Sequence, residues 1–284
     1  MRLRLDLAYD GTDFRGWARQ PGLRTVQGTL EAAIARILGG EPQLVVAGRT
    51  DAGVHASGQV AHLDLDAAQI ARLEKGRSPD PAALAARIGG VLGPYPDVAV
   101  HRTAVAADGF DARFSAVWRR YEYRVADRTA GYDPLERGRT TTVAARLDDD
   151  VMNEAAQSLI GLHDFAAYCK PREGATTIRT LLEFDWRRDA RGILVARVKA
   201  DAFCHSMVRA IVGACVAAGE GRIAAQDVAA IRDAGVRTSA TKVLAARGLT
   251  LTEVGYPADD LLGLRAEQTR ARRAHPDEGV HGED

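Results

Sequence analysis

The residues best suited to chemistry lie together in one short stretch, residues 48–56. It contains the guanidinium of Arg49, the carboxylate of Asp51 and the imidazole of His55. The stretch follows an apolar run and holds two glycines, so its backbone can turn tightly and approach a ligand. A carboxylate there can act as a nucleophile or stabilise a positive charge. A surface turn closed by an Arg49–Asp51 ion pair explains the same residues, and the pattern alone leaves both interpretations open.

Two further uses of this loop have less support. A metal site on Asp51 and His55 lacks a third ligand at helical spacing. A hydrolase using the same pair would need another catalytic group, which we cannot assign. We therefore expect no metal ion here.

The composition indicates an ordinary globular protein. Hydrophobic residues make up 46% of the 284 residues, and the longest apolar runs are far too short to span a bilayer. The charged, alternating N-terminus does not match a signal peptide. We expect a cytoplasmic protein that does not enter a membrane. The formal net charge of +0 does not by itself indicate nucleic-acid binding.

The three cysteines, Cys169, Cys204 and Cys215, are odd in number, widely spaced and without a Cys-x-x-Cys pair. This spacing argues against a disulfide framework and against a thiolate zinc site. Cys204 and Cys215 fall in an apolar helical pattern, so we expect them to be small buried hydrophobic residues.

Periodicity predicts the elements that must position the loop. Apolar residues alternate over 3–9 as in a strand, and Thr25 can cap a helix over 26–38 that ends at Gly39. Strands over 44–46 and 59–65 flank the loop. Further helices are predicted near 84–92, 151–159, 207–216 and 224–234, and further strands near 98–101, 121–125, 181–186, 193–198 and 249–254. This interleaving in both halves predicts an α+β protein of two similar lobes, 1–130 and 131–257. Residues 258–284 are polar and aperiodic, so we expect a mobile, disordered tail.

Other motifs accompany the loop along the chain. The first half carries residues 9–17 with Gln20, then 25–27, 110–116 and 119–123; the second carries 161–165, 179–180, Phe203 with 207–209, and 212–213. In this order, from about residue 3 to 256, they resemble the tRNA pseudouridine synthase A family.

The resemblance implies two ferredoxin-like lobes whose mixed and antiparallel sheets join beneath a central cleft. It implies a homodimer that binds tRNA across both subunits and modifies uridines 38 to 40 of the anticodon stem-loop. Asp51 matches the family's catalytic aspartate, Arg209 the arginine that pairs with it, and Tyr121 the tyrosine that stacks on the uracil. The reaction moves uracil within one nucleotide, so we expect no cofactor.

The family resemblance also suggests the surroundings of Asp51 and the roles of other residues. We expect Asp51 to lie charged in a dry crevice with Arg209 as its partner. Arg49 could fill the space of a flipped base or bind its phosphate. Phe14, Trp17, Gln20 and His55 are candidates for RNA contact, although core packing would also explain Trp17 and a structural role would also explain His55.

Three stretches depart from the family pattern. Residues 204–206 are smaller than the family's usual residues, residues 245–249 lack a common proline, and residues 67–81 resemble an added loop. The departures affect pocket shape and RNA approach. The main rival function is a module of the same fold that binds tRNA without chemistry.

Overall fold

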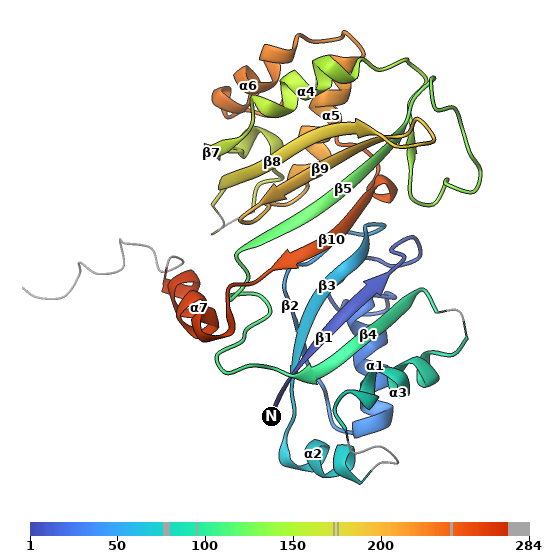
Figure 1. Ribbon diagram of the computed structural model, residues 1–284, viewed down its shortest axis with the longest axis vertical. Coiled ribbons are helices and arrows are strands. Elements are labelled where there is room, and N and C mark those ends of the chain that lie inside the picture. Colours follow the sequence, from blue (N-terminus) through green and yellow to red (C-terminus); the bar gives the residue numbers. More distant parts are fainter. Residues whose placement is uncertain (76–79, 95, 173, 175, 239–240, 272–284) are drawn as a thin grey trace, which may run out of the picture.

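One continuous sheet of ten strands runs through both halves of the chain (Figure 1). The computed structural model describes residues 1–271 except 76–79, 95, 173, 175 and 239–240. Along the sheet the strands follow the order β4-β1-β3-β10-β5-β9-β8-β7, with β2 paired to β3 and β6 paired to β5. Their bounds are β1 Arg2–Tyr9, β2 Leu44–Val46, β3 His55–Asp64, β4 Val98–Val105, β5 Trp118–Ala126, β6 Thr141–Thr142, β7 Gly161–Asp164, β8 Ile178–Arg188, β9 Leu194–Ala200 and β10 Leu249–Gly255.

The N-terminal half packs α1 (Val26–Leu38) and α3 (Ala83–Leu92) against β1, β3 and β4. Every second residue of β1 is buried, as the alternation predicts. The Thr25 hydroxyl accepts a hydrogen bond from the Gly28 backbone N–H at 3.2 Å, which caps α1. Both the strand and the helix are therefore confirmed.

The C-terminal half covers β5, β9 and β8 with α4 (Asp149–Gln157), α5 (Met207–Gly219) and α6 (Ala225–Ala234) (Figure 1). Nearly every residue of α5 is buried, which explains its almost unbroken apolar sequence. Gly213 lets this helix approach the following chain, since a Cβ there would lie 1.8 Å from the Lys242 carbonyl oxygen. α5 is thus the central helix of this half.

Strand β10 joins the two halves. It pairs in parallel with β3 through Thr250 and Leu251 and antiparallel with β5 along its other edge. The expected α+β class with joined mixed and antiparallel sheets is confirmed. Strand β5, which precedes the expected lobe boundary at residue 130, pairs with β9, which follows it.

Two segments expected to lack regular structure form helices. Part of the 67–81 segment is α2 (Ala67–Glu74), which begins with a reciprocal pair of hydrogen bonds between Asp66 and Gln69. Residues 76–79, including the Gly76-Arg77 pair of the supposed loop, lie outside the described residues.

The residues after Pro257 are not simply a tail, which corrects our expectation. They form a short turn and then α7 (Leu262–Ala271), which buries Leu262 and Ala266 to 2% exposure each. Arg270 of this helix donates to the Asp111 carboxylate at 2.8 Å. Polar bonds, such as that of Arg270, help to hold α7, and its two buried apolar side chains are too few to produce a visible apolar period. The tail beyond residue 271 lies outside the described residues.

Candidate active site

The 47–54 loop connects β2 to β3 and rests on the loop that follows β1. The Trp17 backbone N–H donates to the Thr50 carbonyl at 3.0 Å, and the Gly53 N–H donates to the Phe14 carbonyl at 3.3 Å. Any side chain at Gly11 would overlap the Val54 carbonyl, which would lie 2.1 Å from its Cβ. Close packing of the two loops therefore fixes the backbone that carries Asp51.

Phe14 and Trp17 support this arrangement from inside the core. Each side chain is only 1% exposed, which does not fit the RNA contact expected of Phe14 and agrees with the alternative of core packing for Trp17. Gln20 is exposed and its side-chain amide donates to the Arg15 carbonyl at 3.1 Å. Gln20 keeps its place as an RNA-contact candidate.

His55 is also buried, at 7% exposure. Its Nδ1 accepts from the Gly11 N–H at 3.0 Å, and its Nε2 lies 3.0 Å from the carbonyl oxygens of Gly138 and Arg247. Its Nδ1 also lies 3.1 Å from Oδ1 of Asp10. His55 therefore ties the N-terminal half to two segments of the other half. These contacts fit the structural role for His55, and among the described residues its ion pair is with Asp10 rather than with Asp51.

Asp51 faces two basic side chains from the C-terminal half. Its Oδ2 lies 3.6 Å from Nη1 of Arg209, and its Oδ1 lies 3.5 Å from Nε2 of His205. The expected meeting of Asp51 and Arg209 is confirmed. The structure does not show the expected dry crevice, because the Asp51 side chain is 35% exposed. Solvent therefore reaches this carboxylate.

Arg49 takes no part in this cluster. Its side chain is exposed, and among the described residues the ion pairs of Asp51 are with His205 and Arg209 rather than with Arg49. The alternative of a surface turn closed by Arg49 and Asp51 is therefore wrong.

The start of α5 delivers Arg209 to the loop. Ser206 precedes the helix with a left-handed φ of 65°, and Met207 begins it. The Arg209 Nε donates to the Leu244 carbonyl at 2.7 Å, while the Leu244 N–H donates to the Arg209 carbonyl at 3.2 Å. These two bonds hold the guanidinium at the N-terminal end of a buried helix, directed to the opposite half.

Tyr121 lies on β5 with 8% exposure. The Phe203 ring meets it edge-on, with 5.2 Å between the ring centroids. Burial raises the pKa of Tyr121 above its ordinary value, so the phenol keeps its proton at neutral pH. Phe203 and His205 belong to the same segment, 201–206, which leads from β9 into α5.

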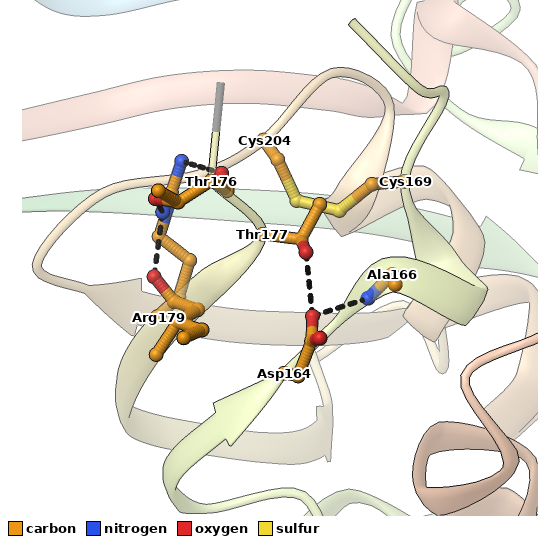
Figure 2. The surroundings of a disulfide bond; sticks show 8 residues. Asp164, Ala166, Cys169, Thr176, Thr177, Arg179 and Cys204 are labelled. Carbon is orange, nitrogen blue, oxygen red and sulfur yellow. Dashed lines mark hydrogen bonds between the residues drawn. A yellow bond between two sulfur atoms is a disulfide. The ribbon is translucent and has the colours of Figure 1, made fainter. Parts of the chain in front are cut away.

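A disulfide joins Cys169 to Cys204 (Figure 2). This corrects both expectations about Cys204, which precedes α5 rather than lying within it. Close by, the Asp164 carboxylate accepts from the Ala166 N–H and the Thr177 hydroxyl. The Lys170 N–H donates to the His205 carbonyl at 2.9 Å. The chain around Cys169 therefore holds the segment that carries His205.

Sequence reasoning did not select His205 as a site residue. The available signal was its place four residues before Arg209, where the chain turns into α5. Cys215, by contrast, is free and buried as expected, and burial raises the pKa of its thiol to about 12. Within the described part of the chain, no group of three or more His, Cys, Asp or Glu could hold a metal ion. No helix of that part is long and apolar enough to cross a bilayer.

Comparison with known proteins shows the class of protein to which this fold and site belong: it is a pseudouridine synthase. Residues 155–257 match the family model described as tRNA pseudouridine synthase. The tRNA pseudouridine synthase A of Leifsonia xyli subsp. xyli is 64% identical over 96% of this chain and 97% of its own length. That of Streptomyces griseus subsp. griseus is 53% identical over 98% of this chain and 96% of its own.

This chain therefore belongs to the tRNA pseudouridine synthase A family. Among solved structures, a chain of a Cbf5-Nop10-Gar1 complex aligns over 90% of this chain and 60% of its own length, with a TM-score of 0.35 and 11% identity. That similarity is too low to carry an argument.

Proposed function

We propose that this protein isomerises uridine to pseudouridine in the tRNA anticodon stem-loop, at positions 38, 39 and 40, with Asp51 as the catalytic carboxylate. The observation that carries the proposal is the 3.6 Å approach of Asp51 Oδ2 to Arg209 Nη1 across the two halves. Family membership supplies the reaction class, and the cluster supplies the carboxylate that this reaction needs.

The reaction breaks the bond between N1 of uracil and C1′ of ribose, rotates the base, and joins C1′ to C5. The C5 proton then leaves and N1 gains a proton, so atoms balance without an external reactant. A carboxylate can attack C1′ or stabilise the oxocarbenium-like sugar. Asp51 would take one of these two roles. No step of this scheme calls for a metal or cofactor.

The target uridine must leave the stem before it can react, which costs a few kcal/mol. In our proposal Tyr121 stacks on the extruded base, and its neutral hydroxyl relays the C5 proton, accepting it on oxygen while it passes its own proton on to water. Arg49 binds the phosphate or fills the vacated space, since its exposed guanidinium suits either role. Gln20 contacts the RNA from the supporting loop.

Arg209 is the proposed charge partner of the carboxylate. A guanidinium at 3.6 Å gives the carboxylate a partner of opposite charge where the bound tRNA excludes water. It also fixes the direction in which the carboxylate points. We propose this as the reason that a buried helix carries an arginine in its first turn.

The family resemblance supports two further statements about the whole protein. We propose that it acts in the cytoplasm and as a homodimer that binds one tRNA across both subunits. Light scattering of the purified chain at several concentrations tests the dimer. A mass of one chain throughout would contradict it.

The deciding experiment follows tritium released from C5-labelled uridine in an unmodified anticodon stem-loop. Asp51→Asn and Asp51→Ala should abolish release, while tRNA affinity stays within roughly tenfold because phosphate contacts dominate it. Asp185→Asn is the control, since it removes a carboxylate that pairs with Arg187 on β8. Equal release from the Asp51 variants would refute the assignment. Binding by the wild type without any release would indicate a tRNA-binding module instead.

A further inference from the structure

Arg119 carries a positive charge into the region where the two halves meet. It lies on β5 two residues before Tyr121, so both side chains point to the same face of the sheet. Among the described residues, no carboxylate forms an ion pair with its guanidinium. Burial lowers the pKa of Arg119, although an arginine keeps its proton at neutral pH. The charged guanidinium is therefore kept in a place where burial disfavours its charge.

The guanidinium donates instead to three backbone carbonyls. Nη2 donates to the Ala47 carbonyl at 2.8 Å and to the Arg113 carbonyl at 3.0 Å, and Nη1 donates to the Asp201 carbonyl at 2.9 Å. The three carbonyls belong to segments far apart in the sequence. One planar fork of N–H groups can reach in these separate directions, whereas the single ammonium of lysine cannot reproduce that geometry.

Two of these segments hold the candidate active site. Ala47 follows β2 directly and stands four residues before Asp51, and its own N–H donates to the Val60 carbonyl at 2.9 Å. Asp201 follows β9 directly and begins the segment that carries Phe203 and His205 into α5. Its carboxylate accepts from the Thr180 N–H at 3.0 Å. Both attachment points are therefore held firmly in their own halves.

The third segment is anchored by the C-terminal helix. Arg113 lies in a turn in which the Asp111 carboxylate accepts backbone N–H bonds at 2.9 Å. Arg270 of α7 bonds that carboxylate, and the Ser115 hydroxyl donates to the Leu262 carbonyl at 3.0 Å. β5 begins beside α7 (Figure 1).

We propose that Arg119 is a positioning residue that sets the separation between the Asp51 loop and the 201–206 segment. This inference rests on the proposed function. The role of Arg119 would be to bring Asp51 to Arg209 and His205. It would also bring Phe203 against Tyr121. A group displaced by about 1 Å in an active site can cost about 100-fold in rate. Arg119 would therefore act on kcat through geometry, without touching the substrate.

The test compares Arg119→Lys with Arg120→Lys. Arg120 is the next residue on β5, points to the opposite face and pairs with Glu183 and Glu253. We expect Arg119→Lys to lower the single-turnover rate of tritium release about 100-fold and to leave the dissociation constant for tRNA within about threefold. Arg120→Lys should retain the wild-type rate within about threefold, because it touches neither loop.

Amide hydrogen exchange gives a second reading that does not depend on activity. In Arg119→Lys, exchange in 47–54 and 201–209 should speed up at least about tenfold, while the centre of β8 keeps its protection. If the wild type releases no tritium, the proposed function fails and the exchange reading alone decides the role of Arg119. A general loss of protection would show that the variant does not fold. The rate of tritium release and the amide exchange would then be measured on Arg119→Gln instead.

Chemical rescue tests whether the directed N–H bonds of a guanidinium are needed, or only a cation that fills the space of the side chain. Arg119→Ala should regain at least about tenfold in rate with added guanidinium ion at concentrations below those that unfold the protein, and not with methylammonium. Wild-type rate and wild-type exchange in Arg119→Lys would overturn the proposal. Equal rescue by both cations would also overturn it, since the directed N–H bonds would then be irrelevant.

Discussion

His205 and Arg209 approach different oxygens of one carboxylate, with His205 Nε2 at 3.5 Å from Asp51 Oδ1 and Arg209 Nη1 at 3.6 Å from Asp51 Oδ2. Both come from the far half, one just before α5 and one within its first turn. The carboxylate is thus oriented by two groups, and the arginine is the one of fixed charge and fixed direction. This difference leads to the first prediction.

Arg209→Met should lower kcat for tritium release about 100-fold, because it removes the charge that orients Asp51. His205→Asn should lower kcat no more than about tenfold, since Arg209 still holds the other oxygen. Steady-state assays with saturating tRNA measure both values of kcat. If His205→Asn had the larger effect, the histidine would be the main partner of Asp51.

Tyr121 offers a ring and a hydroxyl, and two substitutions separate them. Tyr121→Leu removes both and should lower the single-turnover rate by more than about 1,000-fold. Tyr121→Phe keeps the ring and the edge-on contact with Phe203 and should lower the rate about 100-fold, through loss of proton transfer. A Tyr121→Phe variant with the wild-type rate would limit the role of Tyr121 to stacking.

The sequence predicts the elements with strong periods. β1 alternates over its whole length, and α1 has both a cap at Thr25 and an end at Gly39, so their bounds agree with the structure within about one residue. α7 was missed because it buries little more than Leu262 and Ala266 on an otherwise polar helix. Its packing depends on Asp111, which is distant in the sequence.

The site residues likewise divide into those that the sequence predicted and those that it did not. Asp51 and Arg209 were paired through the family resemblance, because no periodicity relates a loop to a helix more than 150 residues later. The sequence did not separate RNA contact from core packing for Phe14 and Trp17, because an aromatic residue in a loop gives the same pattern in both cases. Cys204 was assigned to α5 although that helix begins at Met207, and its pairing with Cys169 has no local signal.

His55 is predicted to stabilise the fold rather than serve the chemistry. His55→Gln should lower the free energy of unfolding by about 2 kcal/mol, because buried backbone groups of both halves lose their partners. The rate of tritium release per folded molecule should stay within about threefold. Urea unfolding and active-site titration measure the two quantities. A large loss of rate without loss of stability would assign His55 to the chemistry.

The disulfide can be tested by counting thiols. Unreduced protein in denaturant should titrate one thiol per chain, that of Cys215, and reduced protein should titrate three. Because the bonded cysteines are separated by 35 positions in the sequence, reduction should cost about 3 to 4 kcal/mol of stability on chain-entropy grounds. Cys215→Ser is the control and should titrate none before reduction. Three thiols in the unreduced wild type would contradict the pairing.

Asp127 makes stability depend on pH in the acid range. Burial alone would raise the pKa of its carboxyl, but hydrogen bonds from Arg188 and from the Leu147 and Ala130 N–H groups lower it to about 2. A folded-state pKa below the ordinary value of 3.8 means that the contribution is complete above that pH. It is lost as the pH falls towards about 2.

Asp127→Asn should therefore lower the free energy of unfolding by about 1 to 2 kcal/mol at pH 7, once solvent screening is allowed for. The difference from wild type should shrink below pH 4 and vanish near pH 2, as urea unfolding at a series of pH values would show. Asp233→Asn is the matched control, because that aspartate also pairs with an arginine but is 64% exposed, so its loss should change stability little at any pH. A deficit in Asp127→Asn that stays constant down to pH 2 would show that packing, rather than the charge of Asp127, stabilises this part of the fold.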